Sequence, residues 1–292
     1  MMAHKESIVH MSDAGQLEAA LREALARNSA CNWYALLDGS QLPDLMHSLR
    51  RGALRGSRYV SLFDERSETG AGDAAPFLVD LRSAANLDRA ISYTVQNALT
   101  SYAVSWIASS LDMRTLAARL AQRLDARLTE NMDVLLRYYD SRILSSLSLT
   151  LTAEQSCNFF NFAQGWWYPA RSGELHSCVS NFAEEETFTP PLAIDQAHEN
   201  RLTDLAFPDA VLEQLLNGQA DLLALMNRAE QHDFVVRQIE HMKELRLESL
   251  SDIVTYCLIA LVDGEDFFMR MPWQEKIAAI KAGKASFREL IT

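Results

Sequence analysis

Two arginines, two tyrosines and one aspartate within six residues are the strongest candidates for chemistry in this 292-residue chain. They form the block Arg137-Tyr138-Tyr139-Asp140-Ser141-Arg142. The block lies where a predicted strand meets a predicted helix, and paired charges are costly to bury in such a place. They either hold a sharp chain reversal together or grip a ligand. We favour the first alternative, a structural clasp made by Arg137, Tyr139, Asp140 and Arg142.

No further catalytic signature accompanies the block. The sequence lacks the HExxH pattern of zinc peptidases and the G-x-S-x-G pattern of serine hydrolases, and its seven histidines do not pair at ligand spacing. The four cysteines have no CxxC spacing, which fits reduced and mostly buried thiols. We therefore expect no catalytic residue, metal or cofactor, although acidic residues distant in sequence could still meet in the fold.

Composition and charge narrow the class of protein. With 48% hydrophobic and 23% charged residues, the chain has the composition of a folded globular protein. A net charge of −12 argues against nucleic-acid binding, which needs a basic surface. Residues 166–292 carry 21 acidic against 11 basic side chains, whereas residues 1–165 carry 18 against 16. The acidic half suits either a basic partner or a solvated helical face.

Hydrophobic segments give no sign of a membrane protein. The longest apolar run, 256–262, is far shorter than the roughly 18 residues that span a bilayer. The first residues lack the apolar region of a secretory signal. These features predict a cytoplasmic protein without membrane contact.

The elements that position the block form a predicted N-terminal lobe, residues 1–183. Leu17, Leu21 and Leu25 recur at helical spacing, and the apolar run 33–38 is typical of a strand. Helices are expected at 13–28, 42–49, 87–99, 112–128, 141–149 and 153–162. Strands are expected at 33–38, 58–63, 77–81, 102–109 and 133–139, followed by a hairpin at 166–182 with Gly173 in its turn. This alternation predicts an α+β or α/β fold.

A linker and a second, all-helical lobe are predicted to follow. Residues 184–194 contain three glutamates and the pair Pro190-Pro191, which favours a linker. No strand pattern recurs over 195–292, where helices are expected near 195–206, 208–230, 232–247, 249–263 and 272–282. At this length a second lobe is usual.

Aromatic residues gather near the predicted junction of the lobes and near the C-terminus. Such side chains supply large buried areas and often anchor interfaces. They either form a core between the lobes or bind a partner. As a hypothesis, the partner-binding residues are Trp166, Trp167, Tyr168, Phe267, Phe268 and Trp273.

Four segments together resemble a known family. They are Trp33–Gly39, Ser61–Phe63, Ala75–Leu81 and Leu136–Leu144. Their order and spacing, over roughly residues 32–168, resemble the type VI secretion effector adaptors, also called Tap or Tec proteins. The shared region of that family was first catalogued as a domain of unknown function. One departure is Ser141, where such proteins often carry a proline whose fixed φ would stiffen the turn.

The resemblance implies a non-enzymatic cytoplasmic adaptor. Such a protein binds a toxic effector and helps to load it onto the VgrG spike, in some cases through a PAAR-containing tip. We expect the effector's N-terminal segment to dock between the lobes, against Trp166, Trp167 and the C-terminal helices. Two alternatives stay open: an immunity protein that neutralises a toxin, and an uncharacterised α/β enzyme.

Overall fold

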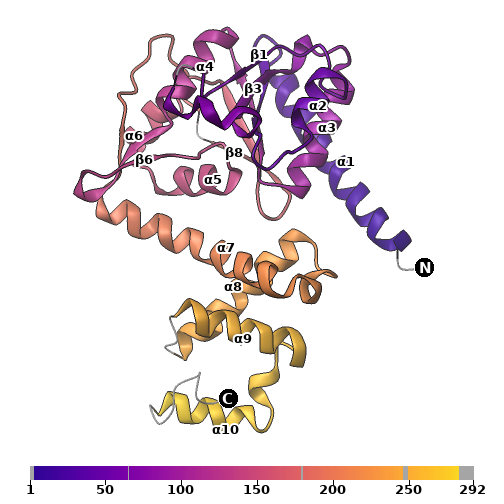
Figure 1. The fold of residues 1–292 in the computed structure, drawn as a ribbon, viewed down its shortest axis with the longest axis vertical. Coiled ribbons are helices and arrows are strands. Elements are labelled where there is room, and N and C mark those ends of the chain that lie inside the picture. The colour runs from indigo at the N-terminus through magenta and orange to yellow at the C-terminus, as the bar shows by residue number, and fades with distance from the viewer. Residues whose placement is uncertain (1–2, 65, 179, 246–248, 283–292) are drawn as a thin grey trace. The chain divides into compact units, whose positions relative to one another are not determined.

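The computed structural model describes residues 3–64, 66–178, 180–245 and 249–282. The chain folds into two compact units, Met1–Leu202 and Thr203–Thr292 (Figure 1). The predicted linker, 184–194, lies within the first of these units. No helix in the described ranges is long and apolar enough to cross a bilayer.

A six-stranded sheet forms the centre of the first unit. Its strands are β1 (Asn32–Asp38), β2 (Tyr59–Ser61), β3 (Pro76–Asp80), β4 (Val104–Ser109), β7 (Gly165–Pro169) and β8 (Leu175–Ser177). They are arranged in the order β2-β3-β1-β4-β7-β8, and every neighbouring pair is antiparallel. The antiparallel sheet followed by helices confirms the α+β alternative.

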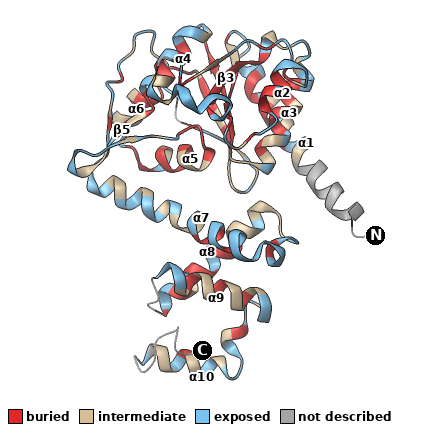
Figure 2. Cartoon of the chain, viewed as in Figure 1, coloured by how far each residue is buried: buried red, intermediate tan, exposed pale blue. Residues whose placement is uncertain are grey.

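Helices cover both faces of this sheet. They are α1 (Ala3–Arg27), α2 (Leu45–Arg50), α3 (Leu87–Thr100), α4 (Met113–Gln122), α5 (Ser141–Thr150) and α6 (Ala153–Phe159). On one face, the Trp106 indole donates a hydrogen bond to Thr94 of α3, and α3 packs beside α1. On the other face, Trp166 packs edge-on against Tyr138. Buried residues therefore follow the strands and the inner sides of the helices (Figure 2).

The region after α4 differs from the sequence prediction. The helix expected to continue to residue 128 ends at Gln122, and β5 (Asp125–Arg127) follows. β5 pairs antiparallel with β6 (Asp133–Leu135) and parallel with β9 (Leu192–Ala193), so pairing between distant segments overrides the helical spacing of leucines. β6 is also shorter than predicted, because the chain already turns at Tyr138 and Tyr139.

The second unit is helical in the part that the structure describes. It contains most of α7 (Gln196–Leu223), then α8 (Arg228–Glu244), α9 (Leu250–Asp263), a 3-10 turn (Phe267–Met269) and α10 (Trp273–Lys281). Pro208 lies inside α7, so the two helices expected on either side of residue 207 form one element, which is interrupted instead at Gln219. The core of the unit is built from Val211, Leu215, Phe234, Ile239, Tyr256, Cys257 and Phe267.

Candidate functional site

Asp140 is the centre of the charged block. Its buried carboxylate caps α5 by accepting a hydrogen bond of 2.9 Å from the Arg142 amide. The same carboxylate accepts two bonds from the Arg142 guanidinium, 3.1 Å from Nε and 2.6 Å from Nη2. This guanidinium also lies 4.4 Å from the ring centre of Tyr102. Asp140 and Arg142 thus fix the turn into α5 with a helix cap and a two-pronged ion pair.

A second buried carboxylate, Asp38, joins the block from the end of β1. It accepts bonds from the Ser40 amide at 3.0 Å, the Ser40 hydroxyl at 2.6 Å and the Gln41 amide group at 2.9 Å. Arg137, which lies 99 residues along the chain, donates to it from Nη2 at 3.2 Å. The segment 33–39 and the segment 136–144 therefore meet in space. The sequence analysis missed Asp38, although an aspartate directly after an apolar strand was a usable signal.

Gln41 connects the two carboxylates. Its Nε2 lies 2.9 Å from Asp38 Oδ2 and 3.4 Å from Asp140 Oδ2, and its Oε1 accepts a bond from the Tyr102 amide at 3.3 Å. The Ser141 amide donates to the Tyr102 carbonyl at 2.8 Å. From here on, the clasp means the observed network of Asp38, Gln41, Arg137, Asp140 and Arg142; it adds Asp38 and Gln41 to the predicted set and leaves out Tyr139, whose ring packs against Phe63. It ties together the loops that follow β1, precede β4 and precede α5.

Gly39 allows the close approach that the clasp needs. A β-carbon at this position would lie 2.1 Å from the Asp73 carbonyl oxygen and 2.7 Å from that of Ala75. The Gly39 amide donates to the Ala75 carbonyl at 3.0 Å, so the turn after β1 is pressed against the start of β3. Any side chain here would have to push backbone aside.

The two tyrosines of the block point into the core. The Tyr138 hydroxyl donates to the Leu120 carbonyl at 2.6 Å, and its ring packs edge-on against Phe159 at 5.8 Å. Tyr139 packs edge-on against Phe63, with the Arg137 guanidinium 5.7 Å from its ring centre. Burial raises the pKa of both phenols, which keeps them protonated. Arg137, Tyr139, Asp140 and Arg142 thus lie around one turn, and their role as a structural clasp stays a prediction.

Arg123 is a fully buried cation outside the clasp, and it was not among the predicted site residues. The side chain is fully buried, and it donates to the Phe159 carbonyl from Nε at 2.7 Å. Its two terminal nitrogens each lie 2.9 Å from an oxygen of Glu186. The guanidinium carbon lies between two rings, 4.8 Å from Phe162 and 4.6 Å from Phe188. The helical spacing of the surrounding leucines gave no hint of this position.

Glu186, which lies in the predicted linker, forms the ion pair with Arg123. Burial disfavours the ionised form, but the bonds from Arg123 and from the Phe188 amide outweigh it and lower the pKa of Glu186 below its ordinary value. Arg119 adds further bonds to the carbonyls of Ala183 and Glu184. The segment 183–188 is therefore fastened to the first unit at several points.

Part of the first unit matches a known protein family. Residues 33–158 match the model of a family described as a domain of unknown function, DUF4123. This matched region begins at β1, ends within α6, and contains every residue of the clasp. Neither the comparison with curated proteins nor that with solved structures gave a match.

The aromatic residues proposed for partner binding occupy different environments. Trp166 and Tyr168 are buried, and the Trp166 indole donates to the Ser105 hydroxyl at 2.9 Å, so both belong to the core of the first unit. Phe267 is buried in the second unit, where its ring lies 5.2 Å from that of Trp273. Trp167, Phe268 and Trp273 are partly exposed. Docking between the two lobes stays a prediction.

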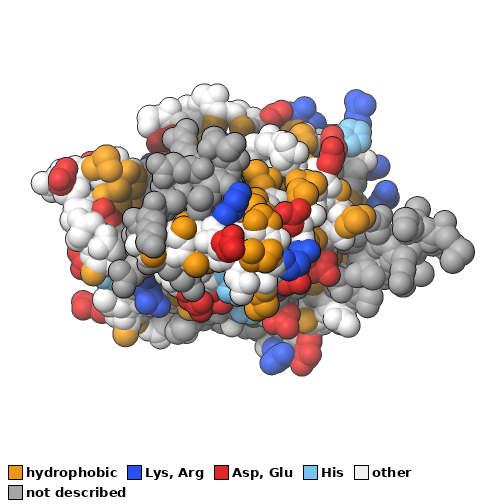
Figure 3. Space-filling view, turned by 90° about the horizontal axis from the view of Figure 1, so that it is seen from below, with side chains coloured by type: hydrophobic (Ala, Val, Ile, Leu, Met, Phe, Trp, Pro, Cys, Tyr) orange, Lys and Arg blue, Asp and Glu red, His pale blue; other side chains and the backbone are white. Residues whose placement is uncertain are grey.

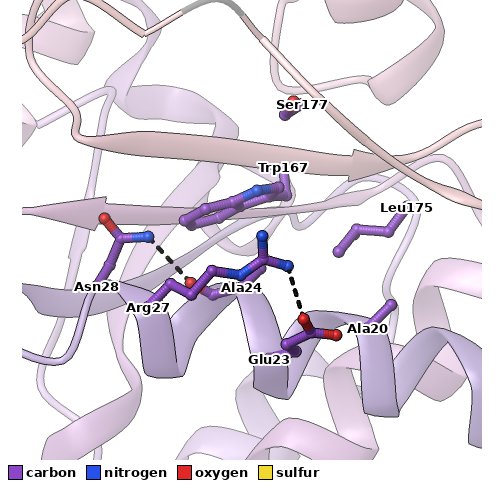
Figure 4. Close-up of a pocket in the computed structure, with 8 residues that line it drawn as sticks. All are labelled: Ala20, Glu23, Ala24, Arg27, Asn28, Trp167, Leu175 and Ser177. Atoms are coloured by element: carbon purple, nitrogen blue, oxygen red, sulfur yellow. Dashed lines mark hydrogen bonds and ion pairs between the residues drawn. The ribbon is translucent and has the colours of Figure 1, made fainter.

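Trp167 lines an open groove of about 330 Å³ between α1 and the β7–β8 hairpin. Figure 4 shows its indole lying across Ala24 and Arg27 of α1, with Leu175 and Ser177 of β8 beside it. A β-carbon on Gly165 would lie 2.1 Å from this indole, so the glycine makes room for the ring.

The second unit also exposes apolar side chains. Val262, Met269 and Met271 stand near the C-terminal end of α9 and the turn that follows it, and all three are largely exposed. Acidic side chains lie close by in sequence, and two of them form ion pairs, Glu265 with Arg237 and Asp266 with Arg270. Figure 3 shows hydrophobic and charged side chains intermixed on one face of the molecule.

Proposed function

We propose that the protein is a non-enzymatic adaptor that binds a type VI secretion effector in the cytoplasm and helps to load it onto a VgrG spike or PAAR tip. The observation that carries this proposal is the match of residues 33–158 to DUF4123, a family associated with such adaptors. Two of the four segments that carry the resemblance, 33–39 and 136–144, are joined directly by the clasp, which supports a common fold rather than a chance similarity of short motifs.

The geometry of the clasp supports binding over catalysis. Asp38 and Asp140 each accept four hydrogen bonds, and each pairs with an arginine. A carboxylate whose oxygens are engaged in this way is held in a fixed position and is poorly placed to take a proton from a substrate. The charged block thus stabilises a scaffold on which other surfaces can bind.

An adaptor of this kind must hold its cargo and then release it. Specific complexes bury about 1,200 to 2,000 Å² in total, with a few aromatic and arginine side chains dominating the affinity. Trp167, Phe268 and Trp273 are partly exposed and offer such anchors. The acidic excess of residues 166–292 favours a partner with a basic surface.

The proposal is tested by deleting the gene in the strain that encodes it. We expect delivery of one effector to stop, while the apparatus still fires and other effectors are still delivered. Native purification of the tagged full chain, followed by mass spectrometry, should recover that effector together with a VgrG or PAAR protein.

Two outcomes would contradict the adaptor role. Unchanged delivery of every effector after deletion would remove the basis for it. Protection of a sensitive cell from the toxin by this protein alone would instead identify an immunity protein. A wild-type copy of the gene, expressed at the normal level in the deletion strain, should restore delivery and so controls for effects of the deletion on neighbouring genes.

A further inference from the structure

We propose that the edge of β8 and the adjoining groove bind an extended peptide segment of a partner, which adds one strand to the six-stranded sheet. Naming that partner as the effector rests on the proposed function, whereas the binding mode rests on the geometry alone. The occupant is a stretch of backbone in β conformation with an uncharged apolar side chain pointing toward α1.

Among the described residues, β8 has a strand partner on one side only. The Cys178 amide donates to the Trp166 carbonyl at 2.9 Å, and the Ala170 amide donates to the Glu174 carbonyl at 2.8 Å. Because antiparallel pairs alternate, the amide and carbonyl of Leu175 and of Ser177 point away from β7. In the part of the chain that the structure describes, β8 pairs with β7 alone. These outward groups match the backbone of an added strand.

The groove provides pockets for the side chains of that strand. Trp167 and Ser177 are cross-strand partners and share the sheet face toward α1, as does Leu175 two residues earlier. They line the groove together with Ala20 and Ala24 of α1 (Figure 4). Alternate side chains of a strand paired with β8 would point toward the same face. An indole and two alanines form an apolar floor for one of them.

The charge of the groove favours an uncharged segment. Its two ionic residues, Glu23 and Arg27, pair with each other at 3.1 Å on the exposed side of α1. Because their charges cancel, the groove has no net charge that would attract a charged side chain of the peptide. With only three residues in β8, a symmetric pairing of two copies would bury far less than the roughly 1,000 Å² that a stable interface needs. A partner segment, which can make further contacts elsewhere, is therefore the better occupant.

The test uses the full chain as bait for random peptides displayed on phage. A synthetic copy of the selected peptide is then titrated by fluorescence anisotropy. We expect Ser177→Pro to weaken binding by about tenfold, because it removes one outward amide and its ring blocks the approach. Ser177→Ala, which keeps the backbone, is the matched control. The ladder bonds to β7 come from neighbouring residues, so the hairpin should persist, as edge prolines usually allow.

Two further measurements make the test independent of one variant. Trp167→Ala should weaken the same peptide at least as much, whereas Leu225→Ala, at an exposed position of the second unit, should not. In the wild-type chain, saturating peptide should slow hydrogen exchange of the Leu175 and Ser177 amides. The proposal is wrong if both Ser177→Pro and Trp167→Ala bind the peptide with full affinity, or if no peptide is selected. It is also wrong if the peptide slows hydrogen exchange only at amides outside β8.

Separate experiments test whether a second copy of the chain covers the β8 edge and whether the protein is an adaptor. If sedimentation shows a dimer that Ser177→Pro dissociates, a second copy covers the edge and the proposal is wrong. If gene deletion leaves all effector delivery intact while the peptide still binds at β8, the adaptor role fails and the edge site stands. If delivery stops but the peptide binds regardless of both variants, the edge site fails and the adaptor role stands.

Discussion

Replacing Asp140 by alanine should destabilise the first unit by about 2 to 4 kcal/mol. Loss of the cap of α5 accounts for about 1 kcal/mol. Loss of the two bonds from Arg142 adds about 1 to 3 kcal/mol, compared with about 1.5 to 3 kcal/mol for a single well-buried hydrogen bond to a charged group. The second contribution is smaller than for a fully buried pair, because the Arg142 side chain is 32% exposed and water can replace part of the interaction.

Asp112→Ala provides a matched control. Asp112 caps α4 in the same way, with bonds from the Arg114 amide at 2.9 Å and the Thr115 amide at 3.1 Å, but its side-chain partner is the Thr115 hydroxyl rather than an arginine. Its replacement should cost about 1 kcal/mol. The difference between the two variants isolates the ion pair of the clasp.

Urea unfolding followed by circular dichroism measures both free energies, and thermal unfolding gives a second reading. For a unit of this size each kcal/mol lowers Tm by about 2 to 4 °C, so Asp140→Ala should lower it by roughly 5 to 15 °C. Because the two units can unfold separately, hydrogen exchange in β1 and α5 identifies the affected transition. An Asp140→Ala chain as stable as Asp112→Ala would refute the structural role, and a stable variant that loses its partner would assign the block to recognition.

Three further substitutions test other parts of the structure. Arg123→Ala should cost about 3 to 5 kcal/mol, because it breaks the buried pair with Glu186 and leaves that carboxylate only the longer, 3.6 Å ion pair with Arg119. Arg237→Ala, in an ion pair about half exposed, should cost under about 1 kcal/mol, and urea unfolding compares the two variants. In the folded chain the pKa of Glu186 lies below its ordinary value of 4.5. The ionised side chain therefore contributes its full stabilisation above pH 4.5, and this contribution is lost as the pH falls through the lower folded pKa. Glu186→Gln should remove this part of the decrease in unfolding free energy with falling pH, as acid unfolding curves would show. Gly39→Ala should cost about 1 to 3 kcal/mol in the same assay, through its clash with backbone, and a wild-type Tm would contradict that packing.

Local sequence patterns were sufficient where an element is determined by its own residues. The apolar run before Gly39 predicts β1, which lies in the middle of the sheet with both faces covered. Gly173 predicts the turn between β7 and β8, and it adopts a φ of 84° that favours glycine. Leucines four residues apart predict α1, whose buried face contains Leu17, Leu21 and Leu25.

Elements fixed by distant partners were beyond such patterns. β5 replaces the predicted end of a helix because β6 and β9 pair with it, and β9 lies 65 residues further along the chain. Arg123 reads as an ordinary polar position in an amphipathic helix, yet Glu186 and two phenylalanines enclose it. Arg137 was recognised as part of a clasp, but its partner Asp38 lies 99 residues away. Charges that bond within their own turn, such as Asp140 and Arg142, were the ones that sequence alone could pair.

The scaffold and the proposed peptide site belong to different parts of the chain. The matched region ends at residue 158, before the β7–β8 hairpin begins, and it contains the whole clasp. No residue of the clasp belongs to this hairpin, so we expect its groove-facing side chains to be exchangeable without disturbing the clasp. We expect exchange of the groove-facing residues Trp167, Leu175 and Ser177, with Trp166 and Tyr168 kept as core, to change which peptides are selected on phage. Replacements of similar size should change the urea unfolding free energy of the first unit by less than about 1.5 kcal/mol, because Trp167 and Leu175 pack against its core but stay partly exposed. Unchanged peptide selection after that exchange would place recognition elsewhere, and a large loss of stability would show that these three side chains belong to the scaffold after all.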